Sequence, residues 1–191
     1  MKKALFISLL LIGFGTQAQV MQLDKASELS VSGTSTLHDW TIVAEEISGS
    51  AKFEISDAQL MGVSDLTIKV KVEEIKSGKS GMDNNTYKAL NSDQHPFISF
   101  NLSNGSASQS GSKYLFSGQG NLTIAGTKKP INLKATCDLA GNSVVCEGSY
   151  AMKMTDFNVD PPTAMFGTIK TGNEITIDFK INFTNSEMSK L

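Results

Sequence analysis

Apolar and polar residues alternate along most of this chain, and this period of two is typical of β-strands that bury one face. The most regular runs cover residues 66–72, 98–102, 114–124 and 175–183. In the last of them every second residue is Ile or Phe, and the residues between are Thr, Asp, Lys and Asn. Shorter runs of the same kind cover residues 28–33, 37–44 and 47–56. The pattern predicts an all-β fold, an antiparallel meander of about eight strands, and that number closes into a small barrel.

Two stretches depart from the alternation. Residues 82–90 place Tyr87 and Leu90 at helical spacing, and Asp83 is a candidate N-cap for this short helix. Residues 155–172 contain Asp160-Pro161-Pro162 and Met165-Phe166-Gly167, which predict a loop with a helical turn. No shift in composition and no repeat indicates a domain boundary, so the sequence predicts one domain.

The two cysteines are predicted to face each other across a hairpin. Gly141-Asn142 suits a two-residue turn, and the register set by that turn pairs Cys137 with Cys146. The same register predicts the inward pairs Leu139–Val144, Ala135–Gly148, Leu133–Tyr150 and Ile131–Met152. An oxidising compartment favours a disulfide. Two free buried thiols and a redox or metal-binding dithiol are the alternatives, although further ligands and redox-motif spacing are lacking.

The first 18 residues have the layout of a secretory signal peptide. Met1-Lys2-Lys3 is positively charged, residues 4–14 are apolar, and Thr16 and Ala18 are small residues at the −3 and −1 positions of a cleavage site. A membrane anchor is the alternative, but about 11 apolar residues fall short of the roughly 20 that a spanning helix needs. We expect cleavage after Ala18 and a soluble mature domain of residues 19–191, periplasmic or secreted from a bacterium.

The charged residues argue against nucleic-acid binding. All 17 basic residues are lysines, against 19 acidic residues, and the formal net charge is −2. Specific readers of DNA and RNA depend on arginine for bidentate contacts to guanine and phosphate. No stretch after the N-terminal one is apolar enough to cross a bilayer. We therefore expect no nucleic-acid partner and no stable membrane insertion, and the sequence leaves a homodimer open.

The sequence contains no recognisable catalytic or metal-binding motif. The two histidines, His38 and His95, belong to no metal-binding pair, and no Gly-x-Ser-x-Gly elbow occurs. Gly78-Lys79-Ser80 resembles the end of a phosphate loop, but Glu stands where the first Gly of that motif belongs. The carboxylate pairs Glu45-Glu46 and Glu73-Glu74 are typical of solvated strand ends. We expect a protein that is not an enzyme and that holds no cofactor and no metal.

The apolar residues include 8 Met and 10 Phe. Methionine is flexible and polarizable, so it suits a wall that must fit a variable apolar guest. From spacing alone, a filled core is the plainer interpretation of these residues.

One hairpin segment carries a family resemblance. Residues 120–131 read GNLTIAGTKKPI, which resembles the G-x-L-T-I-x-G-x-T-x-P-V hairpin of YceI-like proteins. Three smaller pieces fit in the same order: Ser35-Thr36-Leu37-His38, Pro96-Phe97-Ile98-Ser99-Phe100 and Phe166-Gly167. The resemblance covers residues 29–183. It implies an exported, extended, lipocalin-like barrel, in a family of which some members bind a polyisoprenoid or related amphiphile in a long internal tunnel.

Because successive side chains of a strand point to opposite faces, the alternation predicts which residues would line such a tunnel. The candidate ligand-binding residues are His38, Trp40, Ile42, Phe53, Ile68, Val70, Phe100, Tyr114, Phe116, Leu133, Tyr150, Met152, Phe179 and Ile181. His38 either hydrogen-bonds a polar head such as a quinone carbonyl or is satisfied by a neighbouring backbone group. Because a diphosphate head would normally want arginine, a neutral or weakly polar head is favoured.

The sequence thus predicts a binding protein for an apolar or amphiphilic lipid of the isoprenoid, quinone or fatty-acid type, used for transport, storage or sequestration. A ligand-free interaction module is one alternative, and a lipid-modifying enzyme is another. The interior of the barrel separates the first two, because a carrier needs an elongated apolar channel where an interaction module has a filled core.

Overall fold

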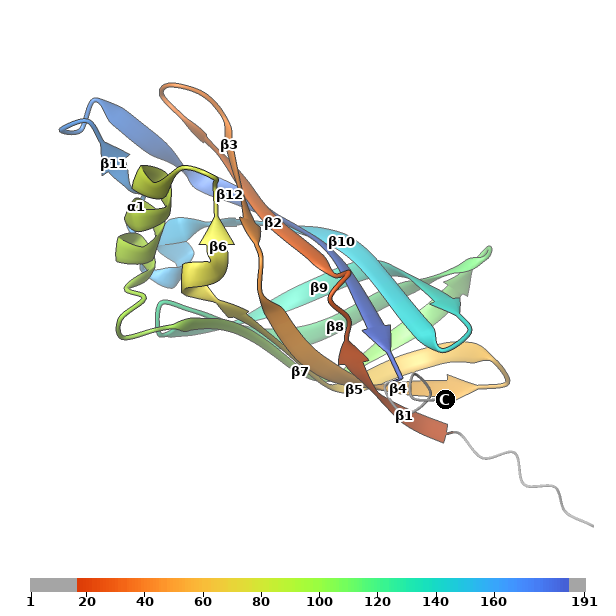
Figure 1. The fold of residues 1–191 in the computed structure, drawn as a ribbon. Helices are drawn as coiled ribbons and strands as arrows, with labels where there is room; N and C mark the ends of the chain where they lie inside the picture. The colour runs from red at the N-terminus through yellow and green to blue at the C-terminus, as the bar shows by residue number, and fades with distance from the viewer. Residues whose placement is uncertain (1–16, 186–191) are drawn as a thin grey trace, which may run out of the picture.

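The computed structural model describes residues 17–185, which form antiparallel strands and one short α-helix (Figure 1). In chain order the elements are β1 (Gln17–Leu23), β2 (Glu28–Ser35), β3 (Trp40–Ala44), β4 (Ile47–Ser56), β5 (Gln59–Lys71), the 3-10 turn η1 (Val72–Glu74), β6 (Ile75–Lys76), α1 (Ser80–Leu90), β7 (Phe97–Ser110), β8 (Lys113–Ile124), β9 (Thr127–Ala140), β10 (Ser143–Lys153), the 3-10 turn η2 (Met154–Phe157), β11 (Thr163–Ala164) and β12 (Ile169–Thr184).

Eight of these strands form a closed ring, in the order β1, β4, β5, β7, β8, β9, β10 and β12. β1 closes the ring, because it pairs with β4 on one side and, through Gln22 and Leu23, with the end of β12 on the other. The predicted barrel of about eight strands is confirmed. Its connectivity is not a simple meander, however, since the first strand lies between the fourth and the last.

Three further strands extend the sheet beyond the ring. β2 pairs with residues 171–180 of β12, β3 pairs with β2, and the two-residue β6 pairs with β3. In Figure 1, β3, β6, α1 and β11 lie together at one end of the barrel, and β1 lies at the other. The two ends of the molecule are therefore built differently.

The alternation in the sequence decides which side chains face the interior. In β8, Tyr114, Phe116, Leu122 and Ile124 are buried, while Lys113 and Leu115 are exposed. Neighbouring strand residues point to opposite faces, so one face of each strand supplies the core. The predicted strands and their inward faces are confirmed in β5, β7, β8 and β12.

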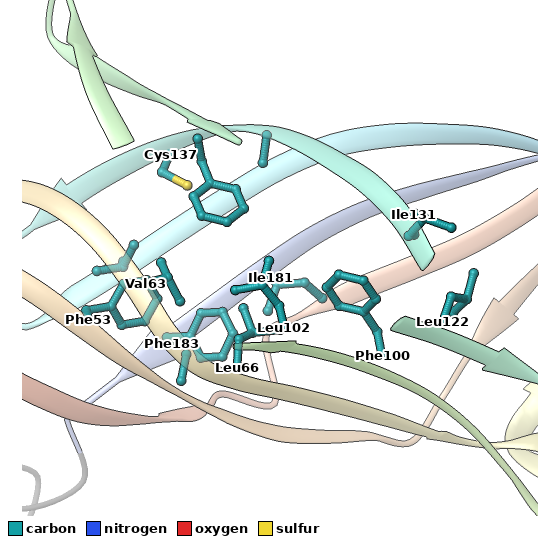
Figure 2. Packing of buried hydrophobic residues seen from close by; sticks show 14 of the residues in the cluster. Phe53, Val63, Leu66, Phe100, Leu102, Leu122, Ile131, Cys137, Ile181 and Phe183 are labelled. Carbon is teal, nitrogen blue, oxygen red and sulfur yellow. The ribbon is translucent and has the colours of Figure 1, made fainter. Parts of the chain in front are cut away.

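The interior is tightly packed at the β1 end. Met21, Phe53, Leu60, Val144 and Phe183 are almost completely buried there. The rings of Phe53 and Phe183 meet edge to face, with centroids 5.2 Å apart. Figure 2 shows both rings between the strands beside Val63, and Phe100, Leu122 and Ile131 farther along the interior. This cluster closes one end of the barrel.

The hairpin between β9 and β10 has the predicted register. Leu139 pairs with Val144 and Cys137 pairs with Cys146, and the two cysteines form a disulfide with their Cα atoms 4.1 Å apart. The short Cα distance fits a non-hydrogen-bonded pair of an antiparallel ladder. The predicted disulfide is confirmed.

The same ladder ends earlier than predicted. Its last pair is Thr136–Glu147, so the expected pairs Ala135–Gly148, Leu133–Tyr150 and Ile131–Met152 do not form. Beyond that pair, β9 stays paired with β8 and β10 stays paired with β12, and η2 contacts β9, β10 and β12.

The predicted helix is present, but it starts earlier than residue 82. Lys79 is the N-cap residue of α1 and gives no side-chain cap. Asp83 is not the N-cap, because it lies within the first turn of the helix. Its carboxylate accepts hydrogen bonds from the backbone N–H and the hydroxyl of Ser77, at 2.7 and 2.6 Å. The helix ends at Asn91 in a left-handed conformation.

Two loop predictions change in detail. The strand predicted over residues 37–44 begins only at Trp40, because the Ser35 hydroxyl accepts hydrogen bonds from the N–H groups of Leu37 and His38 and holds a loop. Residues 155–172 contain the predicted helical turn, η2, and also the short strand β11, which pairs with β12.

The predicted signal peptide falls almost wholly on residues 1–16, which lie outside the described residues. The predicted cleavage site after Ala18 lies within β1. No helix in the described part of the chain is long and apolar enough to span a bilayer.

Candidate functional site

An elongated cavity of about 520 Å³ runs through the barrel. Pockets that take small organic ligands have volumes of roughly 300–1,000 Å³. Every strand of the ring except β1 contributes inward side chains to the wall. The cavity reaches from α1 at one end to Phe53 and Phe183 at the other, so it follows the long axis of the barrel.

β12 shows how the cavity changes along that axis. Ile175, Ile177, Phe179, Ile181 and Phe183 all line it, and eight residue steps of about 3.3 Å span roughly 26 Å of strand. Ile181 and Phe183 are buried, whereas the other three are only half-buried although they point inward. The interior is therefore filled near Phe183 and hollow towards Ile175.

Glycines on neighbouring strands let large rings lie flat against the wall. A Cβ atom on Gly120 would come within 2.4 Å of Cζ of Phe100, and one on Gly148 within 2.6 Å of Cζ of Phe179. Because glycine leaves this space, each ring extends across the next strand and covers it. This orientation keeps the rings out of the barrel axis and leaves the channel open.

Three segments surround the open end: the β2–β3 loop, α1 and residues 162–171. Nearly all polar side chains of the lining gather in these segments, namely Ser35, His38, Lys79, Asn85, Thr86, Thr163 and Thr171. Deeper in, the wall is aliphatic and aromatic, and it includes Tyr150 and Cys146. In the described part of the chain no polar or charged residue is buried. The cavity is thus an apolar chamber with a polar rim.

Hydrogen bonds around Tyr87 hold α1 over this open end. The Tyr87 hydroxyl donates to the backbone oxygen of Glu73 and accepts a hydrogen bond from the Lys76 ammonium group, both at 2.9 Å. The hydrogen bond with Tyr87 raises the pKa of Lys76 above its ordinary value, because it stabilises the protonated form. The Asp83 carboxylate, bonded to Ser77, fixes the first turn of the helix.

His38 lies at the rim. Its Nδ1–H donates to the backbone oxygen of Asp39, with 2.6 Å between the two heavy atoms. In the neutral ring Nε2 then carries no proton and acts as an acceptor. A backbone group therefore satisfies one nitrogen, as the sequence allowed, while the residue also lines the cavity.

The structure brings together all but one of the predicted wall residues. His38, Trp40, Ile42, Phe53, Ile68, Val70, Phe100, Phe116, Leu133, Tyr150, Met152, Phe179 and Ile181 line the cavity.

Tyr114 is the exception, because the structure places it outside the cavity wall. Its side chain is buried, but it pairs with Cys137 near the closed end of the barrel, outside the cavity lining. The alternation in the sequence assigned Tyr114 correctly to the inner face, but it does not tell how far along the barrel axis a residue lies.

Sequence reasoning missed the contribution of α1. Met82, Asn85, Thr86, Ala89 and Leu90 line the cavity, and their spacing of three and four residues places them on one helix face. That spacing was visible in the sequence. Which way the face points depends on how the helix docks, so a strand-based assignment could not include it.

Residues outside the ring were missed as well. Leu29 and Val31 of β2 line the cavity, together with Pro162 and Ile169 near β11. The alternation in residues 28–33 signalled a strand with one dry face. Only the pairing of β2 with β12 shows that this face is turned towards the channel.

The polar groups of the rim do not include the carboxylate pairs singled out in the sequence. Glu45-Glu46 and Glu73-Glu74 lie outside the cavity lining. Within residues 17–185, no three His, Cys, Asp or Glu side chains are grouped so that they could hold a metal ion. What the site offers is apolar surface along the channel and hydrogen-bonding groups at its mouth.

The comparisons with known proteins match this architecture. The YceI-like domain model matches residues 20–183, whereas a search of curated proteins finds no match. Burkholderia cenocepacia BcnA superposes with a TM-score of 0.66 at 19% identity, covering 84% of this chain and 98% of BcnA. A polyisoprenoid binding domain from Saccharophagus degradans, implicated in plant cell wall breakdown, has a TM-score of 0.66 at 12% identity and coverages of 88% and 99%.

A Campylobacter jejuni YCEI protein is also similar, with a TM-score of 0.55 at 14% identity, covering 95% of this chain and 91% of that one. At these identities the solved structures show a shared fold. The family model shows more than a shared fold, because it matches the sequence over nearly all of the described residues. The chain therefore belongs to the YceI-like family.

Proposed function

We propose that this protein binds an isoprenoid or similar amphiphilic lipid, with the apolar tail in the channel and the head at the rim. The observation that carries the proposal is the distribution of polarity: an elongated apolar chamber whose polar lining groups gather at one open end. Membership of the YceI-like family supports it, as does the likeness to a domain named for polyisoprenoid binding. The same binding would serve transport, storage or sequestration.

Burial of the tail supplies enough free energy for this function. Each CH₂ group removed from water contributes roughly 0.8 kcal/mol, so a five-carbon prenyl unit contributes about 3–4 kcal/mol. Association and ordering of the tail cost about 4–15 kcal/mol. Several buried units therefore give net binding without any catalytic group.

The rim favours a neutral or weakly polar head. Lys79 and the Asn85 amide can donate to a carbonyl oxygen, and the Nε2 atom of neutral His38 can accept from a hydroxyl group. The chain has no arginine, the residue that best binds a diphosphate in bidentate fashion. A quinone or a polyprenol fits these groups better than a pyrophosphate.

We also propose that the protein is exported and acts in the periplasm or outside the cell, after cleavage at Ala18. The charge and apolarity of residues 1–14 support this, and the family match begins at residue 20, just after the site. Cleavage there would leave Gln19–Leu23 of β1, including buried Met21, in the mature domain of residues 19–191.

Displacement of a fluorescent apolar probe tests the proposal. N-phenylnaphthylamine is bound to the purified protein and displaced with a short-chain ubiquinone, a polyprenol or a fatty acid. Leu133→Trp places a large ring in the half-buried inner wall, so we expect it to weaken binding about ten-fold or more. Lys134→Trp puts the same ring on the exposed face of β9 and should leave binding unchanged.

Native mass spectrometry adds a second readout, because a co-purifying apolar molecule would appear as a mass that organic extraction removes. If the wild-type protein binds none of the probes, or if Leu133→Trp and Lys134→Trp bind them equally well, the cavity is not the binding site and the proposal is wrong.

A further inference from the structure

Three large apolar side chains project into solvent beside the cavity mouth. Leu37 is 66% exposed, Met165 is 69% exposed and Phe166 is 111% exposed, as open as in a free peptide. Single exposed apolar residues are common on protein surfaces and need no explanation. A group of them at the rim of an apolar cavity is different, and we call Leu37, Met165 and Phe166 the apolar tip.

Hydrogen bonds join the two segments that carry the apolar tip. The backbone N–H of Thr36 donates to the backbone oxygen of Lys170 at 3.0 Å, and the N–H of Lys170 donates to the Thr36 hydroxyl at 3.1 Å. β11 pairs with Ile169 and Lys170, which folds Met165 and Phe166 into the connecting turn. Leu37 and the turn are therefore parts of one connected platform; Figure 1 shows β11 and the β2–β3 loop at the same end as α1.

Folding does not explain the residues of this turn. Met165 and Phe166 have φ angles of 50° and 55°, in the left-handed region, and Gly167 follows at 84°. Turns with successive positive φ angles favour Gly, Asn and Asp. Here two large apolar residues occupy such positions, and both side chains point away from the protein. Packing within residues 17–185 therefore gives no reason for large apolar side chains at these two positions.

The composition around the apolar tip suits a lipid surface. Residues 161–172 contain one lysine and no acidic residue, and residues 34–38 contain no acidic residue, while Asp160 and Asp39 lie just beyond these two stretches. Large apolar side chains with neutral or basic polar neighbours are typical of segments that enter the boundary between lipid headgroups and acyl chains. Three side chains are also too few for a stable protein interface, which takes about 20–30 residues on each side.

The platform is continuous with the cavity. Leu37, Pro162, Ala164 and Ile169 line the channel, and the apolar tip lies on the same two segments. We propose that the apolar tip dips into the surface of a lipid bilayer and thereby sets the cavity mouth against the membrane. A lipid tail could then pass between bilayer and channel without crossing water. The inference deepens the proposed function and rests on it for the identity of the cargo.

Brominated lipids test this contact directly. Phe166→Trp places an indole at the apolar tip, and Leu115→Trp places one on exposed β8 as a matched control. Naturally processed protein is mixed with phosphatidylcholine vesicles that carry brominated acyl chains. A tryptophan that lies at the boundary between headgroups and brominated acyl chains should lose about half its emission or more. We therefore expect quenching in Phe166→Trp. Leu115→Trp and the wild-type protein, whose sole tryptophan is Trp40 in the cavity wall, give the quenching that occurs without an indole at the apolar tip, and quenching in Phe166→Trp should exceed it.

A double variant separates the membrane contact from ligand binding. Met165→Ser with Phe166→Ser removes two apolar side chains that lie outside the cavity lining, so binding of N-phenylnaphthylamine should be unchanged. Co-sedimentation with the vesicles should fall about ten-fold or more.

The possible outcomes distinguish the two proposals. Vesicle contact without probe binding would keep the membrane inference and overturn the lipid-carrier function. Probe binding with no more quenching in Phe166→Trp than in Leu115→Trp would keep the function and overturn the inference. Self-association of the wild-type protein that the double variant loses, with no vesicle contact, would also overturn it, because the tip would then be a protein interface.

Discussion

Trp40 and Gly33 are directly paired across β2 and β3, and their contact shows how single residues shape the wall. The indole lies over the glycine, and its Nε1–H donates to the backbone oxygen of Thr34 at 2.9 Å. The hydrogen bond and the missing Cβ together fix the ring against the sheet. Trp40 lines the cavity, so a shift of the indole would change the channel as well as the packing.

Gly33→Ala tests this arrangement. The new Cβ would lie 2.5 Å from Cζ2 and 2.9 Å from Cε2 of Trp40, and a rigid, hydrogen-bonded ring cannot yield easily. We expect the free energy of unfolding to fall by about 1–3 kcal/mol, as measured by urea denaturation. Because Trp40 is the sole tryptophan, its emission maximum should shift too.

Gly81→Ala is the matched control for that substitution. A Cβ at Gly81 would meet no atom within 4 Å, and alanine is the better helix former by about 1 kcal/mol. This variant should be as stable as the wild type or slightly more stable. Equal losses in the two variants would contradict the contact with Trp40.

At the scale of elements, the β9–β10 hairpin carries the disulfide at the end of the barrel opposite α1. Cys137 is completely buried and Cys146 lines the channel. The bond joins residues nine positions apart, and a loop of that length restricts the unfolded chain by an amount worth about 2–3 kcal/mol. The hairpin therefore stabilises a barrel whose other end is hollow.

Replacing both cysteines measures this contribution. We expect Cys137→Ala with Cys146→Ala to lower the free energy of unfolding by at least about 2 kcal/mol, and thermal or urea unfolding gives the value. A reductant should lower the unfolding midpoint of the wild type and leave that of the double variant unmoved. If the wild type were equally indifferent to reductant, the bond would make no contribution to stability.

At the scale of the whole molecule, β1 determines whether the sheet is a ring. It bridges β4 and β12, which are far apart in the sequence, and it inserts Met21 into the packed end of the barrel. Met21 is 0% exposed, whereas its neighbour Val20 is 58% exposed. Closure of the barrel thus depends on a strand that contains the proposed cleavage site.

Met21→Ala and Val20→Ala compare the two faces of this strand. The first removes a fully buried side chain, and we expect it to lower the free energy of unfolding by about 2–5 kcal/mol. The second changes an exposed side chain and should stay within about 0.5 kcal/mol of the wild type. Similar values for the two variants would mean that β1 does not close the barrel in solution.

Features that local chemistry controls can be predicted from the amino-acid sequence alone. A period of two fixes which side chains of β8 and β12 share a face, and the Gly141-Asn142 turn fixes the register that joins Cys137 to Cys146. The family motif in residues 120–131 identified the family, because its hairpin is one continuous segment. Each of these follows from residues close together in the chain.

The hollow part of the barrel and its position depend on contacts between strands that are distant in the sequence. The alternation places both Tyr114 and Phe179 on an inner face. Tyr114 is nevertheless packed near the disulfide, whereas Phe179 lines the channel. The difference arises from position along the axis and from glycines on adjacent strands, which let rings lie flat. The docking of α1 and the parting of β9 from β10 are non-local in the same way. Strand pairing between distant segments sets all of these, and alternation within a segment carries no information about it.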